Sequence, residues 1–258
     1  MQHVSTPDGI NLSFNRLGSG PPLVLVHGSF SDHSSNWALV IPSLAETFSV
    51  YAVARRGRGE TSVTEGHSLE DEAADIAALI EMIDEQVFLL GHSYGAQVAL
   101  AAAARMPHHV RKLILYEPPW PDTVSQEGQE RLEVLARAGD WDSFATTFFR
   151  DELSVPAEVL GEMRTSEDWR AITADAEASL GDIRAMRRYD FSADRFRDLQ
   201  LPVLLQVGAE SPRDNFATDA LAEALPDASL SELQGQAHEA MQTAPELYVN
   251  SVARFLLT

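Results

Sequence analysis

The chain has 258 residues, of which 45% are apolar, and acidic residues outnumber basic ones 39 to 19, which gives a formal charge of −20. This length accommodates one large α/β domain or two small ones. The acids are spread along the chain, and such a negative surface argues against nucleic acid or an anionic membrane as a partner. Because cysteine is absent, disulfides, zinc–thiolate sites and cysteine nucleophiles are excluded.

No targeting or membrane-spanning segment is expected from the apolar pattern. No apolar run approaches the roughly 18 residues that a membrane span needs. The N-terminal stretch MQHVSTPDGINLSF lacks a basic segment followed by an apolar one, so it does not have the pattern of a secretory signal. A cytoplasmic location is therefore the default expectation, and the oligomeric state stays open.

Short apolar runs predict the strands of a central sheet. A strand with alternating apolar and polar residues is expected at 10–14, after the turn signal Asp8-Gly9. The other runs are wholly apolar, as is typical of parallel strands buried on both faces. These runs are Leu23–Val26, Val50–Val53, Val87–Leu90, Leu113–Leu115 and Val203–Val207.

Helical patterns lie between these strands. Ser68 is a candidate N-cap for a helix over 69–84, and further helices are expected at 94–106 and 245–257. Alternation of strands and helices predicts an α/β fold with a mostly parallel central sheet and helices on both faces.

One long segment breaks this alternation. Residues 118–200 contain no convincing strand, and an insertion of about eighty residues is too long for a connecting loop. We therefore expect residues 1–117 and 201–258 to form the core and 118–200 to form a helical cap over the C-terminal edge of the sheet. The helical patterns of this segment are Gln126–Ala138, Asp140–Arg150, Pro156–Arg164 and Glu167–Arg188.

The sequence Gly91-His92-Ser93-Tyr94-Gly95 has the pattern G-x-S-x-G between a predicted strand and a predicted helix. A turn this tight requires small residues two positions before and after its centre, and the glycines meet that requirement. The turn presents the serine hydroxyl at a helix N-terminus, where negative charge is favoured. Ser93 is therefore the candidate nucleophile.

The turn His27-Gly28-Ser29-Phe30 follows the strand at 23–26 and is placed to present a backbone N–H above Ser93. Together, the N–H groups of Ser29 and Tyr94 would form a two-donor oxyanion hole.

A general base is expected at a strand end. Of the eight histidines, His238 follows the stretch Leu230–Leu233 and precedes the last helix, which makes it the candidate base. His27 and His92 belong to the turns described above. The other histidines lie near the terminus or in polar segments, where they are more often solvated: His3, His33, His67, His108 and His109.

In their order along the chain these motifs resemble the α/β-hydrolase fold. In the strand numbering of that family, HGSF follows the third strand, ARRGRGET the fourth and GHSYG the fifth, and QAHEAM precedes the last helix. The resemblance covers nearly the whole chain. ARRGRGET is similar to the segment D-x-R-G-x-G-x-S of that family, with Ala54 where aspartate is usual. In the family this aspartate generally has a structural role, so the resemblance does not make position 54 catalytic.

The resemblance implies two places for a triad acid. Most members take it from a G-x-x-D pattern after the seventh strand, where this chain has Ser211, with Glu210 one residue early and Asp214 three residues late. The second place is the end of the sixth strand, where Glu117 stands, as in the lactonases that hydrolyse zearalenone. A carboxylate at the lip of a buried strand is costly unless paired, and His238 is a natural partner. We expect Glu117 to be the triad acid, with Glu210 and Asp214 as the alternatives. If Glu117 is not the acid, the expectation is that it pairs with an arginine in a structural role.

A triad of Ser93, His238 and Glu117 implies hydrolysis of a carboxylic ester or lactone through an acyl-enzyme, with no metal or organic cofactor. Hydrolases of carbon–carbon bonds share such a triad, and a ligand-binding or signalling protein on a hydrolase scaffold is the non-enzymatic alternative. The cap segment is rich in aromatic residues, which favours an apolar or aromatic small-molecule substrate, although most such residues pack into a core. These residues are Trp120, Trp141, Phe144, Phe148, Phe149 and Trp169.

Overall fold

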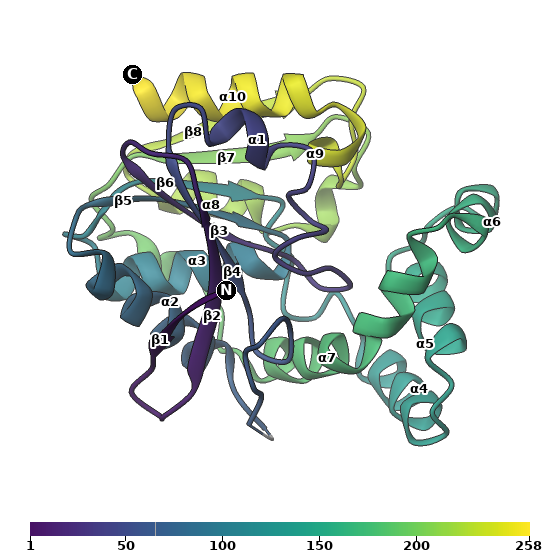
Figure 1. The fold of residues 1–258 in the computed structure, drawn as a ribbon. Helices are drawn as coiled ribbons and strands as arrows, with labels where there is room; N and C mark the ends of the chain where they lie inside the picture. The colour runs from purple at the N-terminus through teal and green to yellow at the C-terminus, as the bar shows by residue number, and fades with distance from the viewer. Residues whose placement is uncertain (65) are drawn as a thin grey trace.

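A computed structural model describes residues 1–64 and 66–258, and within these residues the chain forms one eight-stranded sheet (Figure 1). The wholly apolar runs of the sequence form its buried central strands. The strands are β1 (Gln2–Ser5), β2 (Asn11–Leu17), β3 (Pro22–Val26), β4 (Ser49–Ala54), β5 (Val87–His92), β6 (Val110–Tyr116), β7 (Val203–Gly208) and β8 (Ala228–Leu233).

The strand order in the sheet is β1-β2-β4-β3-β5-β6-β7-β8. The first two strands pair antiparallel, and β2 also runs antiparallel to β4. All other neighbouring strands are parallel. The carboxyl ends of β3 to β8 therefore meet at one edge of the sheet, where ligands bind in open α/β folds.

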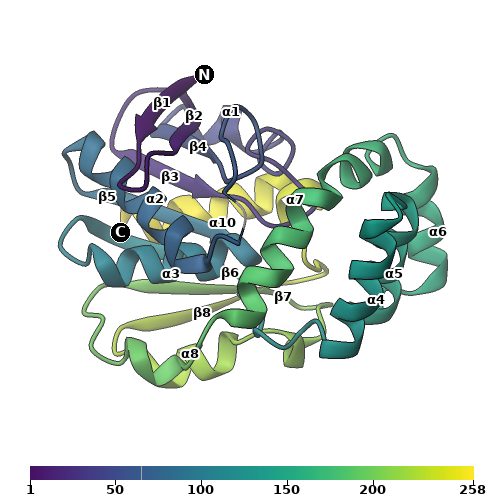
Figure 2. The same cartoon turned by 90° about the horizontal axis from the view of Figure 1, so that it is seen from below.

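Helices cover both faces of the sheet (Figures 1 and 2). On one face α2, α3 and α8 pack on one apolar cluster, and on the other face α1, α9 and α10 pack on a second. In the described residues no helix is both long and apolar enough to cross a membrane. The helices are α1 (Ile41–Leu44), α2 (Leu69–Ile83), α3 (Tyr94–Arg105), α8 (Thr218–Ala224), α9 (Ala240–Thr243) and α10 (Pro245–Leu257).

The predicted fold class is confirmed, and the predicted helix bounds are close to the observed ones. Ser68 caps α2 as expected, since its hydroxyl accepts from the N–H of Asp71 and the Asp71 carboxylate accepts from the N–H of Ser68. The apolar pattern did not predict β1, and it indicated β8 only through the stretch Leu230–Leu233 before His238. Both lie at sheet edges and keep most of their residues partly or fully exposed, so they lack the apolar signal of the central strands.

The long segment between β6 and β7 is helical. Figures 1 and 2 show α4, α5 and α6 standing away from the sheet, with α7 running between them and the sheet. These helices form an apolar cluster of their own, to which the core contributes Phe30. Their bounds are α4 (Gln126–Arg137), α5 (Trp141–Thr147), the π-helical turn η1 (Phe148–Glu152), α6 (Ala157–Thr165) and α7 (Trp169–Arg188).

Candidate active site

Ser93 stands at the sharp turn between β5 and α3. Its backbone has φ 54° and ψ −127°, in a region that residues other than glycine rarely adopt. The N–H of Ser93 donates to the carbonyl of Tyr116 over 2.9 Å, and the N–H of Ala96 donates to the carbonyl of Ser93 over 2.8 Å. Strain at such a residue costs roughly 1–3 kcal/mol and is retained only where the surroundings enforce it.

The two glycines of the turn are required by close backbone approach. A Cβ at Gly91 would lie 2.4 Å from the carbonyl oxygen of Gly95. A Cβ at Gly95 would lie 2.3 Å from the carbonyl oxygens of both Val26 and His27. No side chain fits at these distances, so the G-x-S-x-G pattern is a steric requirement of this strand–turn–helix junction.

Glu117 and His238 lie in direct contact. The ring Nδ1 of His238 is 2.5 Å from Oε2 of Glu117, and the N–H of Gly208 donates to Oε1 over 2.7 Å. Glu117 is fully buried and has φ 49°, directly after β6. Because Nδ1 carries the proton donated to this carboxylate, Nε2 is the nitrogen left to accept a proton from a hydroxyl.

The contact changes the basicity of His238. Burial of the imidazole opposes its protonation, but the hydrogen bond and negative charge of Glu117, with a smaller effect of the Glu239 charge, outweigh burial and raise the pKa of His238 above its usual 6.5. The imidazolium that forms when a base takes a proton is thus favoured here.

The two alternative acids lie elsewhere. Glu210 and Asp214 are exposed, and in the described part of the chain neither side chain bonds to His238. The loop after β7 instead supplies Phe216, whose ring stacks on His238 with centroids 5.3 Å apart and an interplanar angle of 12°. Sequence reasoning missed Phe216, because a single aromatic residue in a loop carries no distinguishing pattern.

The turn after β3 lies against Ser93, the candidate nucleophile. A Cβ at Gly28 would be 3.0 Å from Cβ of Ser93. The N–H of Tyr94 belongs to the first turn of α3 and so has no acceptor within the helix. The hydroxyl of Ser29 donates to Asp182 on α7 over 2.7 Å, and the N–H of the next residue, Phe30, donates to the hydroxyl of Ser179 over 2.7 Å.

Three arginines of ARRGRGET are buried in ion pairs. Arg56 pairs with Asp75 at 2.7 Å, while Arg55 and Arg58 both pair with Asp182, at 2.7 and 2.8 Å. Ala54, which stands where the resemblance leads one to expect aspartate, is buried at the end of β4. Its carbonyl accepts a hydrogen bond from the hydroxyl of Thr61. Sequence reasoning missed this network, although several arginines directly after a buried strand indicate that carboxylates face them.

Two groups of side chains in the described residues bring ligand atoms within 4.8 Å of one another: His92, His238 and Glu239, and His67, Glu72 and Asp182. The first group shares His238 with the Glu117 contact. In the second, Glu72 and Asp182 already pair with Arg55. A cation in the second group would displace these ion pairs, and a cation in the first would displace a hydrogen bond of His92, whose ring nitrogens lie against Asn36 and the carbonyl of His238. We therefore assign a metal to neither group.

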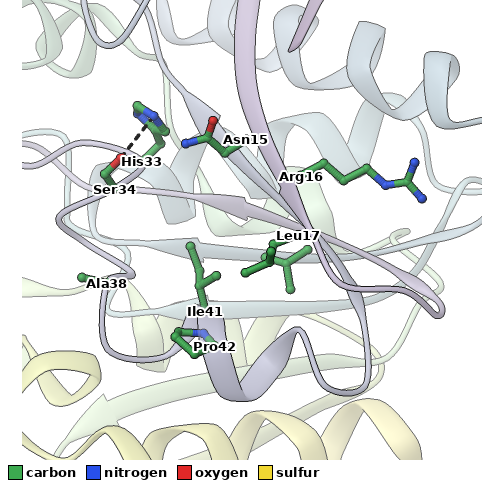
Figure 3. Close-up of a pocket in the computed structure, with 9 residues that line it drawn as sticks. Asn15, Arg16, Leu17, His33, Ser34, Ala38, Ile41 and Pro42 are labelled. Atoms are coloured by element: carbon green, nitrogen blue, oxygen red, sulfur yellow. Dashed lines mark hydrogen bonds between the residues drawn. The ribbon is translucent and has the colours of Figure 1, made fainter. Parts of the chain in front are cut away.

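A depression of about 400 Å³ opens elsewhere on the surface, beside β2 and α1 (Figure 3). Its lining includes Asn15, His33 and Ile41 but neither Ser93 nor His238. It is therefore separate from the candidate catalytic residues.

Comparison with known proteins places the chain in a family. The sequence model of the alpha/beta hydrolase family matches residues 23–251, so the chain belongs to that family. It is 36% identical to 2-hydroxy-6-oxo-2,4-heptadienoate hydrolase of Pseudomonas putida over 74% of this chain and 71% of that protein. It is 28% identical to 2-(acetamidomethylene)succinate hydrolase of Mesorhizobium japonicum over 96% of this chain and 92% of that protein.

A solved structure shows the same fold. An alpha/beta hydrolase from Sphaerobacter thermophilus superposes with a TM-score of 0.87 at 31% identity, covering 99% of this chain and 100% of that one. Both the family and the fold thus identify this protein as a hydrolase-family enzyme.

Proposed function

We propose that the protein is a serine hydrolase that cleaves a carboxylic ester or lactone through an acyl-enzyme. Ser93 is the nucleophile, His238 the base and Glu117 the triad acid. The observation that carries the proposal is the contact between Glu117 and His238, 2.5 Å apart, at the sheet edge where Ser93 sits in its strained turn.

In the first half-reaction, Nε2 of His238 takes the proton of Ser93 as its oxygen attacks the substrate carbonyl. The imidazolium is stabilised by Glu117. It then returns the proton to the leaving alkoxide, which departs as the alcohol. In the second half-reaction, His238 takes a proton from water, the hydroxide attacks the acyl-enzyme, and Ser93 is released with its proton restored.

The oxyanion that forms in both steps is bound by two backbone N–H groups, those of Ser29 and Tyr94. Support comes from the position of Gly28 against Ser93 and from the place of Tyr94 in the first turn of α3. Preorganised donors of this kind are worth about 10²- to 10³-fold each in rate.

Residues 118–200 form a cap on a core made of 1–117 and 201–258, and the substrate is a small molecule that enters between them. The aromatic residues of this segment largely pack on one another and on Phe30, whose ring centroid lies 4.6 Å from that of Phe148. They therefore shape the cap more than they line an acyl pocket, which weakens the argument for an aromatic substrate.

A carbon–carbon bond hydrolase on the same triad is the second candidate. It is favoured by the 36% identity to the Pseudomonas putida protein, whose name gives 2-hydroxy-6-oxo-2,4-heptadienoate as the substrate. A ligand-binding role without turnover is the third, and it requires that Ser93 have no chemical task.

Turnover of p-nitrophenyl acetate, a set of lactones and a vinylogous diketone by the wild type tests all three. Ser93→Ala should lose about 10⁴-fold in kcat, while Ser34→Ala, at an exposed serine, should match the wild type. Turnover of the diketone alone would establish the second candidate. Equal rates for Ser93→Ala and wild type, or no turnover of any substrate, would overturn the proposal.

A further inference from the structure

A buried ion-pair network lies beneath the turn that carries Ser29. Arg55, directly after β4, and Asp182, on α7, are each about 1% exposed. The guanidinium of Arg55 binds both carboxylate oxygens of Asp182, at 3.0 and 2.7 Å. A buried pair of this geometry is rigid, because separating the partners would leave a charge without compensation.

Arg55 holds the peptide that joins Gly28 to Ser29. Its Nη2 donates to the carbonyl of Gly28 over 3.0 Å, and its Nε donates to the carbonyl of His27 over 2.9 Å. The C=O of Gly28 and the N–H of Ser29 belong to one planar unit and point in opposite directions. Fixing the carbonyl therefore fixes the N–H, and donation by a cation to the carbonyl makes the N–H a stronger donor.

Asp182 holds the same turn by a second route. It accepts the hydroxyl proton of Ser29 over 2.7 Å and also binds Arg58 over 2.8 Å. One carboxylate of the insertion thus fixes both the side chain of Ser29 and the guanidinium that orients its peptide.

The network also reaches the second donor residue. The guanidinium of Arg55 lies over the ring of Tyr94, 4.5 Å from its centroid. The hydroxyl of Tyr94 donates to Glu72 over 2.9 Å, and Glu72 pairs with Arg55 over 2.9 Å. Arg55 therefore links the residues that bear both N–H groups of the oxyanion hole.

We propose that Asp182 and Arg55 are positioning residues that set the geometry and donor strength of the oxyanion hole, so that helix α7 of the insertion completes the catalytic site. This inference rests on the proposed function, because it needs an oxyanion at Ser29 and Tyr94. Neither residue touches the substrate; both act through the peptide of Gly28 and Ser29.

The test compares Asp182→Asn with Asp75→Asn. Asp75 is the matched control, since it is the buried partner of Arg56 from the same arginine segment, and its hydrogen bonds within the described residues go to Arg56 and not to the Ser29 turn. For each variant, titration with a fluorophosphonate counts the reactive Ser93 sites. Steady-state kinetics on p-nitrophenyl acetate give kcat and KM. Binding of a trifluoromethyl ketone, which forms a tetrahedral adduct with the serine, reports the affinity of the oxyanion hole.

For Asp182→Asn we expect kcat per titrated site to fall roughly 10- to 100-fold, less than loss of a whole donor, with KM changed by less than about threefold. Affinity for the trifluoromethyl ketone should fall by the same factor as kcat. Asp75→Asn should keep wild-type values per titrated site. A merely structural role would lower only the number of titrated sites, and that result would overturn the inference.

Should Asp182→Asn not fold, Ser29→Ala removes one bond to Asp182 and keeps the N–H. We expect a loss of roughly 3- to 10-fold in kcat with a parallel loss of ketone affinity; unchanged values would overturn the inference. If the fluorophosphonate does not label Ser93 of the wild-type protein, both the proposed function and this inference are overturned. If Ser93 is labelled but Asp182→Asn and Ser29→Ala keep wild-type kcat and ketone affinity, this inference alone is overturned.

Discussion

Glu117 and His238 follow strands that are not neighbours, β6 and β8, and their side chains meet across the end of β7, which lies between them. The N–H of Gly208, at the end of β7, donates to the other carboxylate oxygen of Glu117 and fixes its orientation. The carboxylate thus follows one strand, is oriented by the end of the next and contacts a histidine that follows the third.

The first prediction concerns the charge of Glu117. Glu117→Gln keeps the size of the side chain but removes the charge that stabilises the imidazolium, so kcat should fall roughly 10²- to 10⁴-fold with little change in KM. Glu210→Gln and Asp214→Asn, at exposed loop acids, should stay within about tenfold of the wild type. Steady-state kinetics on p-nitrophenyl acetate decide, and a larger loss in either control would move the acid to the loop after β7.

The second prediction concerns pH. As the proposed base, His238 can accept a proton only when it is neutral, so kcat/KM should fall as the pH drops through its pKa. Glu117 raises that pKa, so its removal in Glu117→Gln should shift the acidic limb of the profile to lower pH. The profile of residual activity against pH measures this directly. An unmoved limb, or one moved upward, would show that Glu117 does not set the basicity of His238.

The third prediction concerns the strained backbone of Ser93. Glycine adopts positive φ without steric cost, so Ser93→Gly should be inactive yet more stable than Ser93→Ala by about 1 kcal/mol. Urea unfolding of the two variants provides the comparison. Equal stabilities would mean that the turn stores no strain at this residue.

The fourth prediction concerns the close approach at Gly95. Gly95→Ala places a methyl group 2.3 Å from two carbonyl oxygens and should destabilise the fold by about 1–3 kcal/mol or more. Gly161→Ala in α6, where nothing lies within 4 Å of the added methyl, should stabilise it by roughly 0.5–1 kcal/mol. Thermal unfolding of both variants measures the difference, and a Gly95→Ala protein as stable as the wild type would refute the steric argument.

The turn at Ser93 was predictable from sequence because its determinants are local. The apolar run before it, the helix after it and the two glycines all lie within a few residues, and backbone sterics alone join them. The same holds for the cap of α2 at Ser68 and for the central strands, whose apolar runs report burial on both faces. The family and fold class follow from these local signals in order along the chain.

The carboxylate that contacts His238 and the network under Ser29 were decided by tertiary structure. A sequence with 39 acidic residues offers Glu117, Glu210 and Asp214 as partners for His238, and only the strand order places the first against the ring. Asp182 lies 127 residues from Arg55 along the chain and meets it only because α7 passes along the sheet edge. Local sterics determine how a residue is presented, whereas the pairing of buried charges depends on which distant elements the fold brings together.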